Sequence, residues 1–193
     1  QEASSFLGSA FLVTIFIIFI ILVTQFHSFM IPFIILGTIL LSFIGLFWGL
    51  IITRTPFCII MTGVAVITLA GLVVKNGIIL LDFLVILRKE GLSKREACIE
   101  ASKIRFRPVM LTAIAAILGL LPMSTGISYD FHKWEWVTHS EASEWWSSMS
   151  NAVIFGLAFA TILTLVVVPV TYYLMDEIKT KLWIKWFKRI PPL

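Results

Sequence analysis

The chain carries little charge for its length. Only 13% of its 193 residues are Asp, Glu, Lys or Arg, while 59% are hydrophobic. A soluble globular domain usually carries about a quarter charged residues, so the composition argues against a soluble domain. Glycine and proline are not in excess, which argues against collagen-like and disordered chains.

The chain is also poor in groups that could form disulfides, metal sites or catalytic centres. Cys58 lies in an apolar run and Cys98 in a charged run, and we expect both to be small apolar side chains without a disulfide. His132 and His139 match no strict zinc-ligand spacing, so we expect no metal and no cofactor. Ser147 and His139 lack a third group, and no glycine-rich phosphate loop is present, so we expect no enzyme.

Long apolar runs are what the sequence has instead. The hydrocarbon core of a bilayer is roughly 30 Å thick and needs about 20 helical residues to cross. Five runs meet this test, and none alternates like a strand of a membrane barrel. They cover about 6–26, 30–52, 56–87, 108–123 and 152–174. We therefore predict an all-α membrane protein, with a bundle of five transmembrane helices over residues 1–174 and short amphipathic surface helices.

Basic residues gather in two segments outside these runs. They are concentrated in the loop 88–107 and in the basic, aromatic tail 175–193, whereas the Trp-rich loop 124–150 has Lys133 alone against four acids. By the positive-inside rule, the loop 88–107 and the C-terminus are predicted to be cytoplasmic, and the N-terminus and the loop 124–150 external. An external N-terminus without a signal sequence suggests that an external domain precedes Gln1. This topology also explains the basic residues, so we expect no nucleic-acid partner.

The loop 88–107 contains a helix-start pattern. Ser93 and Glu96 have the spacing of a capping box, and Ala97, Ala101 and Ile104 would then share one face. The pattern predicts a short amphipathic helix on the cytoplasmic membrane surface, with a solvated connector helix as the alternative.

Two residues carry formal charge within the predicted spans, Lys75 and Asp82. A charge at mid-membrane costs at least about 2.5–3.5 kcal/mol. Seven residues separate the two by about 10.5 Å along a helix, too far for a direct salt bridge. Since no other span contains a carboxylate, we infer that an acidic helix from elsewhere packs against Lys75. The alternative is that Lys75 lies in a polar crevice with water and Asn76.

A lysine paired in this way could couple proton entry to helix movement. Its ammonium would keep intramembrane carboxylates ionised, and protonation of a carboxylate would free the lysine to reorient. Asn76 and Thr112 could extend the hydrogen-bonded path. Thr112 lies among small residues that permit close helix approach, and it could alternatively be a helix-packing hydroxyl only.

Several motifs in order resemble the resistance–nodulation–cell division (RND) transporters. The run 71–83 (GLVVKNGIILLDF) resembles their tenth transmembrane helix. The run 105–112 (RFRPVMLT), followed by GLLP at 119–122, is similar to the eleventh. The runs 155–157 and 163–169 (LTLVVVP) are similar to the twelfth, and 25–32 (QFHSFMIP) resembles the turn between the eighth and ninth.

The resemblance implies a proton-driven exporter in the bacterial inner membrane, multi-pass, with a periplasmic N-terminus. It also implies a homotrimer with a periplasmic adaptor and an outer-membrane channel, which exports hydrophobic or amphiphilic substrates. Lys75 would face two aspartates on the N-terminal half of the transporter, in the same or a separate chain. Thr112 would be the relay threonine, and Arg105 would line the cytoplasmic proton exit. Asn76 and Asp82 would lie beside the path, and the Lys–Asn pair resembles the hydrophobe/amphiphile efflux branch.

Two features depart from the family pattern. The residues of the N-terminal half, with its aspartates and the periplasmic porter regions, are not in this sequence, and the loop 124–150 is longer than in the best-known multidrug pumps. A lipid or sterol handler, or a protein-export helper, of the same superfamily is therefore an alternative, as is a non-transporting membrane subunit that docks on a partner. Membrane lipids are expected partners in every case.

Overall fold

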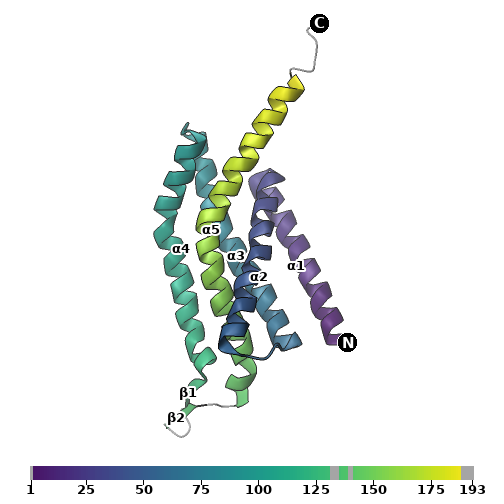
Figure 1. The fold of residues 1–193 in the computed structure, drawn as a ribbon, viewed down its shortest axis with the longest axis vertical. Coiled ribbons are helices and arrows are strands. Elements are labelled where there is room, and N and C mark those ends of the chain that lie inside the picture. The colour runs from purple at the N-terminus through teal and green to yellow at the C-terminus, as the bar shows by residue number, and fades with distance from the viewer. Residues whose placement is uncertain (1, 131–134, 139–140, 188–193) are drawn as a thin grey trace.

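A computed structural model describes residues 2–130, 135–138 and 141–187, with side-chain detail for 2–127 and 145–178. Within these residues the chain forms a bundle of long helices (Figure 1). The helices are α1 (Glu2–Phe26), α2 (Met30–Thr53), α3 (Ile59–Lys89), α4 (Lys94–Thr125) and α5 (Glu141–Phe187), and the strands are β1 (Ile127–Asp130) and β2 (Glu135–Thr138). All five helices are long and apolar enough to cross a membrane. The predicted all-α membrane bundle is confirmed.

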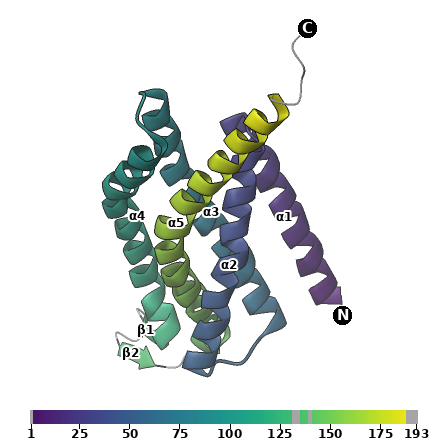
Figure 2. The ribbon, with the colours of Figure 1, turned by 45° about the horizontal axis from the view of Figure 1, so that its top comes forward.

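The helices run up and down, so the connecting segments alternate between the two ends of the bundle. The turns 27–29 and 90–93 lie at the end where α5 finishes, while the N-terminus and the strands lie at the other end (Figure 1). In two views, α4 and α1 lie on opposite sides of the central helices α2, α3 and α5 (Figure 2). The two basic segments of the sequence therefore share one end of the bundle.

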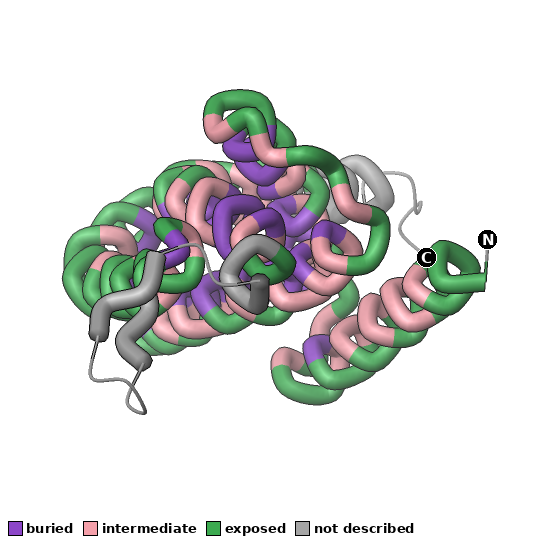
Figure 3. Tube along the Cα trace, turned by 90° about the horizontal axis from the view of Figure 1, so that it is seen from below, coloured by how far each residue is buried: buried purple, intermediate pink, exposed green. Residues whose placement is uncertain are grey.

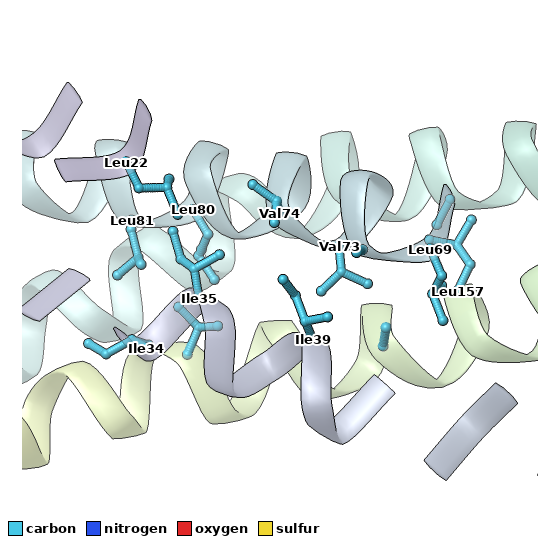
Figure 4. Packing of buried hydrophobic residues seen from close by; sticks show 14 of the residues in the cluster. Leu22, Ile34, Ile35, Ile39, Leu69, Val73, Val74, Leu80, Leu81 and Leu157 are labelled. Carbon is cyan, nitrogen blue, oxygen red and sulfur yellow. The ribbon is translucent and has the colours of Figure 1, made fainter. Parts of the chain in front are cut away.

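The core lies where α2, α3 and α5 meet. Figure 4 shows Val73 of α3 beside Ile39 of α2, and Leu69 of α3 beside Leu157 of α5. These four side chains are fully buried or nearly so. Because no water competes for the backbone in a membrane, helices satisfy their own polar groups and packing decides how they associate.

Glycines bring α2 and α5 into close contact. A Cβ atom at Gly45 would lie 2.3 Å from the Cβ of Phe159, and one at Gly49 would lie 2.3 Å from the Cβ of Phe155. Real Cβ atoms do not approach this closely, so only glycine fits at these positions. The four-residue spacing is that of the small-residue motifs at membrane helix interfaces. The α2–α5 contact is therefore specified by Gly45 and Gly49.

The helices α1 and α4 are peripheral. Leu22 is the one buried side chain of α1, and residues such as Leu12 and Phe16 are exposed. Figure 3 shows buried residues in the middle of the bundle and α1 set apart, exposed along most of its length. Contiguous apolar surface of this kind suits lipid or another membrane helix.

The helix α4 corrects one expectation from the sequence. A short surface helix in 88–107 was expected to be separate from a span at 108–123, yet one helix runs from Lys94 to Thr125. The capping box of Ser93 and Glu96 is confirmed as its start. Proline removes a single backbone hydrogen bond, which membrane helices tolerate, so Pro108 does not end the helix.

The start of α4 also packs against protein. Lys94 forms a 2.8 Å salt bridge with Asp176 of α5, and Ala97, Cys98 and Ala101 are buried. Ala97 and Ala101 of the predicted face therefore pack against neighbouring helices, where the sequence had suggested the membrane surface, whereas Ile104 of the same face is exposed.

In the segment 124–150, where the sequence suggested a loop, the described residues include two short strands and the start of α5. The strands β1 and β2 pair antiparallel, with Ile127 opposite Thr138 and Asp130 opposite Glu135, and α5 begins at Glu141. Strands of four residues are too short to stand out by alternation alone. The residues His132 and His139 lie outside the described part of the chain. The helix α5 also extends past the predicted span at 174 to Phe187.

Candidate functional site

The helix α3 has one buried face and one open face. At 100° per residue, Gly71, Lys75, Ile78 and Asp82 fall within an arc of about 60°. The buried residues lie on the opposite side and pack into the core, with Leu69, Val73, Leu80, Leu81 and Leu84 as its largest members. The two charged residues of the predicted spans therefore share the face of α3 that turns away from its own bundle.

No other part of the described chain covers the two charged side chains on this face. Lys75 and Asp82 are exposed, and within the part of the chain that the structure describes neither side chain forms an ion pair or a hydrogen bond. A Cβ atom added at Gly71 would meet no atom within 4 Å. We call the stripe of Gly71, Lys75, Ile78 and Asp82 the open face of α3.

Arg105 joins α4 to α3 beside this face. Its guanidinium carbon lies 4.5 Å from the centre of the Phe83 ring, which is within the range of a cation–π contact. Its Nε atom is buried and has no hydrogen-bond partner among the described residues. Arg105 is thus held against the residue that follows Asp82.

Thr112 lies at about the level of Lys75. The helices α3 and α4 are antiparallel, and Arg105 contacts Phe83. Moving seven residues along α4 covers about 10.5 Å, which on α3 leads back to residue 76, to within a helical turn. The Thr112 hydroxyl donates to the carbonyl of Val109 at 2.9 Å. That bond belongs to helix packing, and the hydroxyl oxygen can still accept a further bond.

The surroundings of Thr112 are small and open. Pro108, Thr112, Ala115 and Gly119 fall within about 60° on α4, and all four are exposed. A Cβ atom at Gly119 would meet nothing within 4 Å. We call these four residues the small face of α4. Small residues let another helix approach closely.

Asn76 lies on another side of α3. It is 5% exposed and follows Lys75 by about 100° around the helix. Lys75 is on the open face, outside the crevice with Asn76 that the sequence allowed as an alternative. The structure therefore brings Lys75, Asp82, Arg105 and Thr112 to one side of α3 and α4, and it places Asn76 within the bundle.

The sequence did not reveal the ion pair between Lys94 and Asp176. The two residues are 82 positions apart and meet only because α4 packs along α5, with a 2.8 Å separation between Nζ and Oδ2. The only indication of this pair in the sequence was that its two charges lie in or beside the two basic segments. Many other pairs of opposite charge were possible there. This pair fixes the start of α4 against α5.

Comparison with known proteins places the chain in a family. Residues 1–176 match the AcrB/AcrD/AcrF family. The multidrug resistance protein MdtC of Erwinia tasmaniensis is 32% identical over 165 residues, which are 85% of this chain and 15% of that protein. The swarming motility protein SwrC of Bacillus subtilis is 34% identical over 91% of this chain and 16% of its own length. This chain thus spans about a sixth of these relatives.

A solved structure has the same fold. The crystal structure of a heavy metal efflux pump superposes with a TM-score of 0.70 and 29% identity, over 84% of this chain and 14% of that one. The residues that match the family, 1–176, contain α1 to α4 and most of α5, with the open face of α3 among them. The chain is a multi-pass inner-membrane protein that belongs to the AcrB/AcrD/AcrF family of the RND superfamily.

Proposed function

We propose that this chain supplies the C-terminal membrane half of the proton relay in a proton-driven efflux transporter. The observation that carries the proposal is an exposed lysine at mid-helix on the open face of α3. An unpaired ammonium facing hydrocarbon is costly, and no carboxylate among the described residues of its own chain pairs with it. A second set of helices that carries intramembrane aspartates, in the same or another polypeptide, would seat on this face.

The relay would work by switching an ion pair. With the aspartates ionised, the Lys75 ammonium pairs with them and holds the two sets of helices in one packing. A proton that arrives from outside neutralises a carboxylate and removes most of its attraction for the lysine. Lys75 then reorients, and the packing between the two sets of helices changes.

Other residues near the open face have supporting roles in this proposal. Thr112 lies near the level of Lys75 and can accept a bond from the released ammonium. Asp82 and Arg105 lie about two turns further toward the basic end, where the proton would leave. Asn76, being buried in the bundle, would stabilise α3 instead of touching the proton path directly.

The direction and the cargo are further parts of the proposal. The end of the bundle with the basic segments would be cytoplasmic and the N-terminus periplasmic. The transporter would work as a homotrimer with an adaptor and an outer-membrane channel. Hydrophobic or amphiphilic compounds would be its substrates, in keeping with the multidrug resistance proteins among its relatives.

Replacing Lys75 with methionine tests the relay. Methionine has a similar length and no charge, and we expect Lys75→Met in the complete transporter to abolish proton-coupled export while assembly stays near normal. Export would be measured in proteoliposomes with an imposed pH gradient and a fluorescent amphiphile, and assembly by size-exclusion chromatography.

Lys89→Met is the matched control. Lys89 is an exposed lysine on the same helix, at its basic end, and its replacement should leave export within about twofold of the unmodified protein. Export retained in Lys75→Met would contradict the relay and favour a subunit that does not itself transport.

A further inference from the structure

A groove lies between the first turns of α4 and the second half of α5. It encloses about 670 Å³, and its apolar walls include Ile99 from α4 and Val166, Val170 and Leu174 from α5. These four side chains are between 45% and 59% exposed. The groove is therefore an apolar surface that the chain itself leaves uncovered.

Two polar side chains in the groove have partners within the chain. The Cys98 thiol lies 3.6 Å from the carbonyl oxygen of Pro169, to which it donates. The Ser102 hydroxyl donates to the carbonyl of Cys98 at 2.9 Å. Because Cys98 and Ser102 bond to backbone oxygens, an alkyl chain could lie over them without leaving either donor unpaired.

Two cations stand at the groove. Arg95 and Lys103 both line it and are exposed. Two acids at this end of the bundle already have partners, since Asp176 pairs with Lys94 at 2.8 Å and Glu96 accepts a bond from the backbone of Ser93. Lys94 pairs with Asp176, just past the apolar run of α5 that ends at residue 174. The neighbouring Arg95 is therefore level with the headgroup layer, and the long side chain of Lys103 extends toward the same layer from further in. The site thus combines an apolar channel with positive charge at headgroup depth.

The groove faces away from the proposed seat of the second set of helices. On α4, Arg95, Ile99 and Lys103 point about 130–170° from the middle of the small face formed by Pro108, Thr112, Ala115 and Gly119. A partner helix on the open face of α3 would therefore leave the groove uncovered. Lipid is the remaining neighbour of a membrane helix in that direction.

We propose that this groove is a binding site for one anionic phospholipid. An acyl chain lies between Ile99 and the α5 wall, and the phosphate pairs with Arg95 and Lys103. Charge complementarity selects anionic over zwitterionic headgroups, since clusters of basic residues beside a span attract anionic lipids. The site requires only that the bundle is inserted in a membrane, so it stands or falls independently of the proton relay.

Native mass spectrometry of the complete transporter tests the site. Delipidated protein would be titrated with dioleoyl phosphatidylglycerol or with dioleoyl phosphatidylcholine. We expect the double variant Arg95→Gln/Lys103→Gln to weaken the first phosphatidylglycerol about tenfold and to leave phosphatidylcholine binding unchanged. Glycerol 3-phosphate, which offers the phosphate without an acyl chain, should not displace the lipid.

Three further variants keep the result interpretable. Lys89→Gln/Arg107→Gln removes two exposed cations of the same end that do not line the groove, and it should bind phosphatidylglycerol like the unmodified protein. Val170→Trp fills the groove and should also remove the site, while Lys75→Met should keep it. Equal losses in both double variants, or equal affinity for the two lipids, would overturn the proposal, as would a protein helix seated in the groove of the complete transporter.

Discussion

At the residue scale, α3 carries the two charged side chains of its predicted span and its neutral amide on different faces. Lys75 and Asp82 lie on the open face of α3, whereas Asn76 is 5% exposed and packed within the bundle. The sequence predicted that Lys75 would need a partner from outside, and the exposed position agrees with that hypothesis. Only the structure shows that Asn76 and Lys75 lie on different faces of α3. Adjacent residues on a helix differ by about 100°, and the sequence does not say which face is buried.

For Thr112, mutation can distinguish a role in the proton relay from a role in helix packing alone. A hydrogen bond to an ionised group is worth about 1.5–3 kcal/mol, so loss of the hydroxyl in Thr112→Val should slow proton-coupled export at least about tenfold. Thr112→Ser keeps the hydroxyl and should retain most of the export. Both would be measured as substrate flux in proteoliposomes driven by a pH gradient.

Thr24→Val provides the comparison for Thr112. Thr24 is an exposed threonine of α1 that bonds to the carbonyls of its own helix, at 2.8 Å to Ile21 and 3.0 Å to Ile20. Its replacement should not change export. If Thr112→Val behaves in the same way, Thr112 serves helix packing alone.

At the element scale, the number and order of the membrane helices could be read from the apolar runs, but their ends could not. A run stops being apolar where it leaves the membrane, while backbone hydrogen bonding continues. For this reason α4 begins at Lys94, well before the predicted span at 108, and α5 continues to Phe187. The capping box at Ser93 could be predicted from the sequence because it depends only on nearby side chains and backbone groups.

The contact between α2 and α5 makes the sharpest prediction about packing. Gly49→Ala would place a Cβ atom 2.3 Å from the Cβ of Phe155. The Phe155 Cβ cannot move away unless the backbone of α5 moves with it. The helices must separate, and overpacking of this kind costs about 1–3 kcal/mol. We expect a lower midpoint of thermal unfolding for the complete transporter. The midpoint would be measured by the fluorescence of a dye that does not react with thiols.

Gly37→Ala on the same helix is the control. A Cβ atom there would meet nothing within 4 Å, and alanine favours the helix more than glycine does. The midpoint should stay the same or rise slightly. A Gly49→Ala variant as stable as Gly37→Ala would show that α2 and α5 do not pack as closely as described.

At the scale of the whole molecule, the bundle presents surfaces that its own helices do not cover. The open face of α3, the small face of α4 and most of α1 are exposed. The chain spans about 15% of the MdtC protein of Erwinia tasmaniensis, so further protein to cover these surfaces exists in such relatives. Covering a mid-helix lysine calls for an anion, and this requirement is the physical basis of the proposed relay.

The measurement that tests this account most directly is a structure of the complete transporter in a lipid bilayer, solved at high pH so that its carboxylates are ionised. The account predicts a carboxylate oxygen from another set of helices within about 4 Å of the Lys75 Nζ atom, where a pair of opposite charges attracts strongly. A Lys75 side chain surrounded by lipid tails or bulk water, with no acidic group beside it, would contradict the account.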